Sequence, residues 1–302
     1  MSQGTKLSAE HAKLLDKIFT ARGGFMGYDV MGAMEQLSTV EYTDLMTAYA
    51  AALLSKALKL PPGAPWPPTE KRDDYGFRDV DGPRRQPMID AVMGRLVKLT
   101  QARSVVDLGC GTGRWLASCL AHGATEVVGV DAYPADDRLM IPTTSFVQAE
   151  LREPVDLGRT FDAAVCLWLG ECIEEKHAET LVRTCVAAAP VVCFAAATPL
   201  STGPRPWFHE EWPSYWARLF LAHDYVPLEI LRDQLWNVPE CRPKLTQALI
   251  LFVKRDHLPR LPGLASARVT EDLALLDRVH PNEYLSMTHD YMHIMQIEGM
   301  GD

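Results

Sequence analysis

The sequence lacks any long run of basic residues. Lys and Arg number 30 against 39 Asp and Glu, which gives a formal net charge of −9. A surface that binds nucleic acid must neutralise phosphates with Lys and Arg. The composition therefore argues against a DNA or RNA partner. Hydrophobic residues make up 47% and charged residues 23% of the chain, as is usual in globular proteins.

Long apolar runs and paired cysteines are also missing. No segment reaches the roughly 18 apolar residues that span a bilayer, and the first residues lead into a charged amphipathic stretch rather than a signal-peptide core. None of the seven cysteines forms a CxxC pair, and Cys166 and Cys193 lie within apolar runs. We therefore expect a cytoplasmic protein with reduced thiols, no bound metal and no membrane partner.

Residues 1–85 are predicted to form a helical segment. Ser38 and Glu41 have the spacing of a capping box, and a single apolar face follows between Leu45 and Leu58. Five prolines between Pro61 and Pro68 then prevent the helix from continuing. This segment is expected either to cover a pocket as a lid or to form a homodimer contact, and both alternatives remain open.

From about residue 88, apolar runs alternate with helical patterns. The expected strands are 104–108, 126–130, 145–147, 163–167 and 191–196, with helices at 113–121 and 176–188 between some of them. This alternation predicts a parallel sheet covered on both faces. Two more strands, 225–231 and 248–253, are expected to form a closing antiparallel hairpin across an irregular loop. We therefore predict a domain at 86–255 and a C-terminal extension at 256–302.

The most informative segment is a glycine-rich loop. Residues 105–115, VVDLGCGTGRW, place Gly109, Gly111 and Gly113 between a buried strand and a helix. Glycines allow the backbone to turn tightly and to approach a bound molecule closely. Asp131 follows the next expected strand, where a carboxylate can accept hydrogen bonds from both ribose hydroxyls.

Two details separate this loop from a nicotinamide site. The glycine spacing is GxGxG and not the GxGxxG that accommodates a pyrophosphate. Asp107 also precedes the glycines, where its carboxylate would repel a pyrophosphate and attract an ammonium group. The alternative, an ordinary tight turn between a strand and a helix, does not account for the two acidic residues.

Residues 106–113, VDLGCGTG, resemble the first motif of class I S-adenosylmethionine-dependent methyltransferases. The resemblance covers about residues 88–255 and implies a seven-stranded, mostly parallel, doubly wound α/β sheet, the Rossmann-like methyltransferase fold. It implies that Asp107 and Gly109–Gly113 contact the methionine part of the cofactor, that Asp131 holds the ribose and that Glu150 lies near the adenine amine. The family more often has Asp at this last position. The full expected cofactor set is Asp107, Gly109, Cys110, Gly111, Gly113, Asp131, Ala132, Glu150, Leu151 and Leu167.

Residues 161–171 resemble the fourth-strand motif of the family, and residues 211–216 and 223–225 loosely resemble a subgroup found in sugar and natural-product pathways. We therefore expect a small-molecule acceptor. Glu171 and His209 are the expected catalytic residues, because both follow strands whose loops face the reacting methyl group in this family. His223 is a third acid–base candidate, for which packing or capping is the alternative role.

Other interpretations remain open. Glu171 could instead be a solvated carboxylate at a helix start, and His209 a polar residue near a helix N-terminus. Trp207, Trp212 and Trp216 could bind an apolar or cationic group or belong to the core. His289 and His293 have the spacing of a helical zinc site, but no third ligand is evident. The chain could also use the same cofactor for other chemistry, bind it without catalysis or, least in keeping with the loop, be a nicotinamide dehydrogenase.

Overall fold

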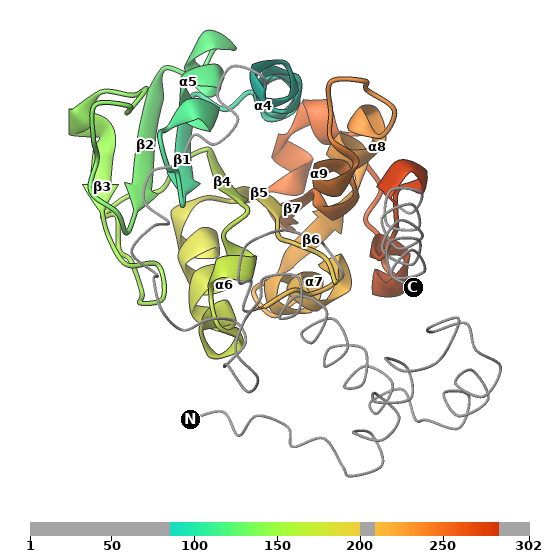
Figure 1. The fold of residues 1–302 in the computed structure, drawn as a ribbon. Helices are drawn as coiled ribbons and strands as arrows, with labels where there is room; N and C mark the ends of the chain where they lie inside the picture. Colours follow the sequence, from blue (N-terminus) through green and yellow to red (C-terminus); the bar gives the residue numbers. More distant parts are fainter. Residues whose placement is uncertain (1–84, 200–208, 284–302) are drawn as a thin grey trace, which may run out of the picture. The chain divides into compact units, whose positions relative to one another are not determined.

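Seven strands form one sheet, in the order β3-β2-β1-β4-β5-β7-β6, in the part of the chain that the computed structural model describes, residues 85–199 and 209–283 (Figure 1). These residues belong to one compact unit, Asp73–Met287. The strands are β1 (Ser104–Leu108), β2 (Glu126–Asp131), β3 (Phe146–Gln148), β4 (Ala163–Leu167), β5 (Val191–Ala195), β6 (Tyr225–Leu228) and β7 (Ile250–Lys254).

The first five strands run parallel to one another. Asp107 of β1 is in register with Gly129 of β2 and Val165 of β4, so β1 is paired on both sides. Strand β7 runs antiparallel to both β5 and β6. Because the strand order reverses beside β1, the carboxyl ends of β1 and β4 border the crevice where open α/β sheets bind ligands.

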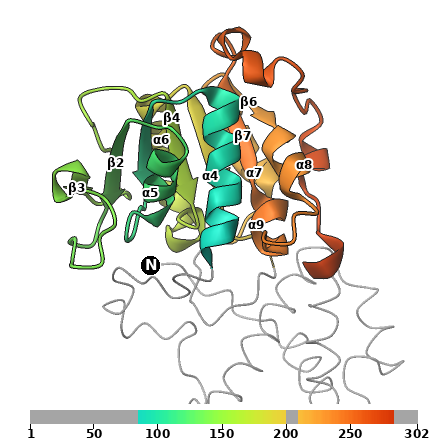
Figure 2. The ribbon, with the colours of Figure 1, turned by 90° about the horizontal axis from the view of Figure 1, so that it is seen from above.

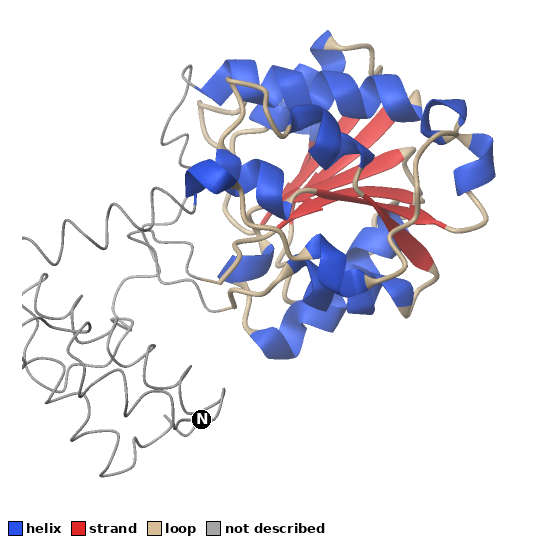
Figure 3. Cartoon of the chain, turned by 90° about the vertical axis from the view of Figure 1, so that its right-hand side faces the viewer, coloured by secondary structure: helices blue, strands red, loops and turns tan. Residues whose placement is uncertain are grey.

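Helices cover both faces of the sheet, as Figure 3 shows. The α-helices are α4 (Gln86–Thr100), α5 (Arg114–Ala121), α6 (Ala178–Ala188), α7 (Pro213–Leu221), α8 (Ile230–Leu235) and α9 (Pro243–Ala248). Short 3-10 helices are η4 (Thr143–Ser145), η5 (Gly170–Cys172), η6 (Glu175–His177), η7 (Leu258–Arg260), η8 (Pro262–Leu264) and η9 (Leu273–Leu276). On one face, α4 lies between α5 and α8 (Figure 2).

Two hydrophobic cores follow from the alternation of side chains along the strands. Val105 and Val165 point into the core beneath α4, α5, α8 and α9. Their neighbours Val106 and Cys166 point into the opposite core, beneath α6 and α7. All five residues of β4 and of β5 are buried, which explains their continuous apolar runs, since a strand covered on both faces has no solvated side.

The predicted α/β fold and the antiparallel end of its sheet are confirmed. The connection between β6 and β7 was predicted wrongly as an irregular loop, because it contains α8 and α9. Ile230 and Leu231, expected at the end of a strand, begin α8, and Ala248 ends α9. These helices are six residues long, too short to show a clear helical period.

The predicted N-terminal helical segment, Trp207, His289 and His293 lie outside the described residues. No helix within the described ranges is long and apolar enough to cross a membrane. All seven cysteines are free, and all but Cys172 are buried, in agreement with their prediction as small hydrophobic side chains.

Gly263 of η8 gives a direct test of how the C-terminal segment packs on α4. A Cβ atom at this position would lie 2.2 Å from the carbonyl oxygen of Leu99, a backbone atom that cannot rotate away. We expect Gly263→Ala to lower the free energy of unfolding by about 1–3 kcal/mol, the usual cost of overpacking. Urea unfolding measures this change. An unchanged free energy of unfolding in Gly263→Ala would contradict the predicted steric conflict.

Candidate active site

The loop between β1 and α5 requires glycine at three positions. Gly109, Gly111 and Gly113 have φ angles of 86°, 52° and 74°, in the left-handed region that glycine adopts without strain. A Cβ on Gly113 would lie 3.0 Å from Ile141, whereas a Cβ on Gly111 would meet nothing within 4 Å. The loop is therefore packed against the protein at Gly113 and open at Gly111, where a bound molecule can approach the backbone.

Asp131 holds this loop from the end of β2. Its Oδ2 accepts a hydrogen bond of 2.8 Å from the backbone N–H of Gly111, and its Oδ1 accepts one of 3.0 Å from that of Tyr133. Burial raises the pKa of Asp131, although these backbone donors act in the opposite direction. The carboxylate thus lies beside the open part of the glycine loop, at the position expected for a group that binds ribose hydroxyls.

Asp107 is the most unusual group of the site. The residue is 2% exposed, and its Oδ2 has no hydrogen-bond partner in the described part of the chain. Burial, followed by the charge of Asp131, raises the pKa of Asp107 to about 8. A buried carboxyl without a partner is costly, and the ammonium group of a methionine moiety would supply the missing donor. The residues present therefore fit S-adenosylmethionine.

The remaining expected cofactor residues lie around the same edge. Cys110 and Leu151 are buried, and Leu167 is the last residue of β4. The carbonyl oxygen of Ala132 accepts a hydrogen bond of 3.1 Å from the amide of Gln148. Glu150 is exposed and pairs with Arg152 at 2.5 Å, a contact that lowers the pKa of Glu150. An adenine amine would therefore have to compete with Arg152 for this carboxylate.

Glu171 and His209, the expected catalytic residues, both lie near the segment that follows β5. Glu171 in η5 is 2% exposed, and its Oε2 accepts a hydrogen bond of 3.3 Å from the backbone N–H of Ala197. The alternative of a solvated carboxylate is therefore wrong. His209 is 6% exposed, and neither ring nitrogen has a hydrogen-bond partner among the described residues. Burial lowers the pKa of His209, so its imidazole favours the neutral form.

Trp216 packs against His209 and beside the backbone that precedes Glu171. Its ring centroid lies 5.2 Å from that of His209 and 4.9 Å from that of Phe194 in β5. A Cβ on Gly170, the residue before Glu171, would lie 2.7 Å from the Trp216 ring. Trp216 is 2% exposed, which agrees with a core position and places η5 directly against α7.

The sequence motifs did not identify three hydrophobic residues of the site. Ile141 packs on Gly113 and on Gly129 of β2, and Leu169 packs on Gly109. Trp168, directly after β4, has a φ of 62°, a conformation that is uncommon for a bulky residue and is often found at functional sites. The motif at residues 161–171 contains Trp168 and Leu169, but it does not reveal their contacts, because these depend on separate loops.

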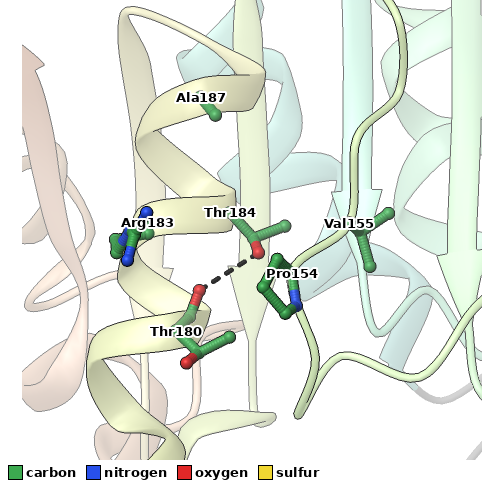
Figure 4. Close-up of a pocket in the computed structure, with 6 residues that line it drawn as sticks. All are labelled: Pro154, Val155, Thr180, Arg183, Thr184 and Ala187. Atoms are coloured by element: carbon green, nitrogen blue, oxygen red, sulfur yellow. Dashed lines mark hydrogen bonds between the residues drawn. The ribbon is translucent and has the colours of Figure 1, made fainter.

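His223 lies away from this edge. Its Nε2 is 2.9 Å from Oε1 of Glu179 in α6, where it forms a surface pair. A cavity of about 190 Å³ lies beside the same helix and is lined by residues that include Pro154, Arg183 and Thr184 (Figure 4). No residue of the glycine loop contributes to it. Within the described ranges, no group of three or more His, Cys, Asp or Glu residues is placed to hold a metal ion.

Comparison with known proteins agrees with this geometry. The sequence model of a family described as a methyltransferase domain matches residues 80–226. Among curated proteins, the chain is similar to ribosomal RNA large subunit methyltransferase E of Hyphomonas neptunium, with 38% identity over 61 residues, or 20% of this chain and 25% of that protein. The chain thus spans about a quarter of the length of that relative.

Solved structures similar to this chain include the sugar N-methyltransferase KedS8 from Streptoalloteichus, with 18% identity over 59% of this chain and 90% of that chain and a TM-score of 0.42. Another is Streptomyces venezuelae DesVI, with 21% identity, 40% and 55% coverage and a TM-score of 0.33. With the sheet order, the glycine loop and its two acidic residues, the family match makes residues 80–226 a methyltransferase domain of the class I S-adenosylmethionine-dependent family.

Proposed function

We propose that this chain transfers a methyl group from S-adenosylmethionine to a small-molecule acceptor. The observation that carries the proposal is the buried Oδ2 of Asp107, which has no partner in the described part of the chain and belongs to the end of β1, directly before the glycine loop. Asp131 holds Gly111 of that loop, and Glu171 and His209 follow the neighbouring strands β4 and β5. One edge of the sheet thus provides groups for both the cofactor and the acceptor.

Each cofactor residue has a physical role in this proposal. Bound S-adenosylmethionine supplies an electrophilic methyl group on a cationic sulfur. Asp107 accepts a hydrogen bond from the ammonium group, and Asp131 accepts hydrogen bonds from the ribose hydroxyls. The open backbone at Gly111 admits the cofactor without a steric conflict.

His209 is the proposed proton acceptor. Its lowered pKa keeps the imidazole neutral near pH 7, and a neutral imidazole can remove a proton from an acceptor during transfer. Glu171 either orients the acceptor or takes the proton in place of His209. The hydrogen bond that Glu171 accepts from the Ala197 N–H favours the orienting role. Both residues follow strands whose carboxyl ends meet at the same edge.

The acceptor is proposed to be a small molecule because the formal net charge of −9 opposes binding of a polyanion. The H. neptunium relative is named as a ribosomal RNA methyltransferase. An RNA acceptor is therefore tested by label transfer to ribosomal RNA. Non-methyl chemistry at the sulfonium would appear in product analysis, and a binding module without activity would take up the cofactor but convert no acceptor.

Isothermal titration of the full chain with S-adenosylhomocysteine tests the cofactor site. We expect micromolar binding to the wild type and a loss of about tenfold or more, about 1.4 kcal/mol, in Asp131→Ala, because the ribose contacts are lost. Asp136→Ala is the matched control, since Asp136 lies in the loop that directly follows Asp131 but pairs with Arg138 at the surface. NAD should not bind.

Two results would reject this assignment. One is the absence of S-adenosylhomocysteine binding to the wild type, and the other is equal binding by the Asp131→Ala and Asp136→Ala variants. Binding of NAD in place of S-adenosylhomocysteine would instead support a nicotinamide enzyme.

A further inference from the structure

Carboxylates surround the expected acceptor edge. Glu171 is buried beside β5, and Glu175 in η6 lies close enough to affect the ionisation of His209 and Glu211. Besides burial, the charge of Asp277 also raises the pKa of Glu211, whereas that of Arg218 in α7 lowers it. Carboxylates therefore outnumber cations among these groups and give this edge a negative potential, which favours a positively charged acceptor.

Ala197 contacts both the side chain of Glu171 and the backbone of Glu211. Its backbone N–H donates to Oε2 of Glu171 at 3.3 Å, and its carbonyl oxygen accepts from the backbone N–H of Glu211 at 3.2 Å. The backbone of Glu211 is therefore held beside Ala197, just past the end of β5, although Glu211 is 40 residues away from Glu171 in sequence. The arrangement depends on the fold and not on a local motif.

The buried side chain of His209 is a second and independent indication that a polar molecule binds at this edge. His209 is 6% exposed, and both its ring nitrogens lack partners in the described part of the chain. Its ring packs edge-on against Tyr215, with the centroids 4.9 Å apart. Buried polar atoms are normally hydrogen-bonded, so a polar group on an acceptor would satisfy this imidazole.

We propose that the acceptor is a basic amine, held by Glu211 and Glu175 and deprotonated by His209. This inference rests on the proposed function and assigns the chemical class of its acceptor. Tyr215, which packs on His209 and is partly exposed, provides an aromatic surface for the apolar body of the amine. Glu211 and Glu175 are thereby specificity-determining residues, and a carboxylate or phosphate acceptor is repelled by them.

The chemistry balances with these groups. An ammonium acceptor gives one proton to the neutral His209 and becomes an amine with a free lone pair. The lone pair forms a bond to the methyl carbon as the carbon–sulfur bond breaks, and the electrons of that bond stay on sulfur. The products are S-adenosylhomocysteine and a methylated ammonium, while the proton on His209 passes to solvent.

The electrostatic state of Glu211 agrees with this assignment. Burial, followed by the charge of Glu175, raises the pKa of Glu211. The free protein therefore opposes negative charge at this position, and a cation that enters would offset the repulsion between the two carboxylates. A neutral alcohol would not gain from that interaction.

Three probe molecules that share an indole ring but differ in charge test which acceptor charge the site prefers. Tryptamine is a cation, tryptophol is neutral and indole-3-acetate is an anion. We would titrate each into the full chain saturated with S-adenosylhomocysteine. Tryptamine should bind at least tenfold more tightly than the other two, and Glu211→Gln or Glu175→Gln should weaken only tryptamine, by about threefold or more, as expected for a charge contact. Glu240→Gln, at an exposed position in another turn, is the matched control.

The outcomes separate the two proposals. If S-adenosylhomocysteine itself does not bind, the proposed function fails. The amine assignment is overturned if S-adenosylhomocysteine binds but tryptamine binds no more tightly than tryptophol and indole-3-acetate. It is also overturned if tryptamine shows no binding at about 10 mM. Equal weakening of all three probes by Glu211→Gln also overturns it, because that result indicates a structural role.

Discussion

Replacing Asp107 with asparagine is expected to stabilise the free protein and to weaken its cofactor binding at the same time. The carboxyl is 2% exposed, and its Oδ2 has no partner in the described ranges. A buried group without a hydrogen-bond partner costs about 1–3 kcal/mol of stability. Removing this charge should therefore raise the melting temperature at pH 9 by about 2 to 10 °C. The same change removes the charge that binds the ammonium, so binding of S-adenosylhomocysteine should fall at least about tenfold.

The effect on stability depends on pH in a defined direction. The pKa of Asp107 rises from 3.8 in the unfolded chain to about 8 in the folded one. Between these values the folded chain holds the extra proton, so the free energy of unfolding falls as the pH rises through this window. Below pH 3.8 and above pH 8 the contribution is constant. The stabilisation in Asp107→Asn should therefore be full at pH 9 and small at pH 5.

Asp162→Asn is the matched control, with the opposite sign. Partial burial opposes ionisation of Asp162, but hydrogen bonds from Ser104 and Arg103 outweigh it and lower its pKa. That variant should lose stability at neutral pH, and the loss should disappear as the pH falls below the folded pKa. Melting curves of Asp107→Asn at pH 5, 7 and 9, and of Asp162→Asn at pH 7 and at about pH 2, make the comparison. A destabilised Asp107→Asn protein at pH 9 would contradict our interpretation of the buried carboxyl.

Cofactor binding should also release a proton from Asp107. The free carboxyl is mostly protonated at pH 7 because its pKa is about 8, and an ammonium partner requires the charged form. Titrations in phosphate and in Tris, which differ in ionisation enthalpy, should show release of close to one proton by the wild type and none by Asp107→Asn. No difference between the two buffers for the wild type would reject a protonated Asp107.

The sequence was sufficient to predict the sheet and the cofactor loop because their signals are local. β4 and β5 are continuous apolar runs since they are buried on both faces. Gly109 and Gly113 lie in left-handed turns that other residues rarely adopt. These constraints act on neighbouring positions, so they remain visible in one sequence.

Other features depend on contacts across the fold and left no local pattern. The burial of Glu171 arises from η5 packing on α7 and from the Ala197 N–H. Ile141 reaches the glycine loop from the segment between β2 and β3. Spacing along the chain could therefore nominate Glu171 but could not establish that its carboxyl is buried.

Loss of Glu229 is expected to destabilise the fold strongly, because it would leave a buried arginine without its carboxylate. Arg232 of α8 is 0% exposed, and its Nη1 donates to Oε2 of Glu229 at 3.0 Å and to the carbonyl oxygen of Leu276 at 2.8 Å. Burial lowers the pKa of Arg232 to about 10. Glu229 also forms an ion pair with Arg278 at 2.9 Å and accepts a hydrogen bond from Thr270, so one carboxylate joins α8 to the C-terminal segment.

Glu229→Ala should therefore lose about 3–5 kcal/mol of unfolding free energy, the usual result of removing one partner of a buried ion pair. Asp233→Ala is the control on the same helix. Asp233 is 61% exposed and pairs with Arg278 at 3.4 Å, so its loss should cost less than about 1 kcal/mol. The double variant Glu229→Ala, Arg232→Met should recover much of the stability, since no charge then remains buried at Arg232. Urea unfolding of the full chain measures all three. If the double variant is less stable than Glu229→Ala, the cost does not come from an uncompensated charge, and the contact of Arg232 with Leu276 is the interaction that holds the C-terminal segment on α8.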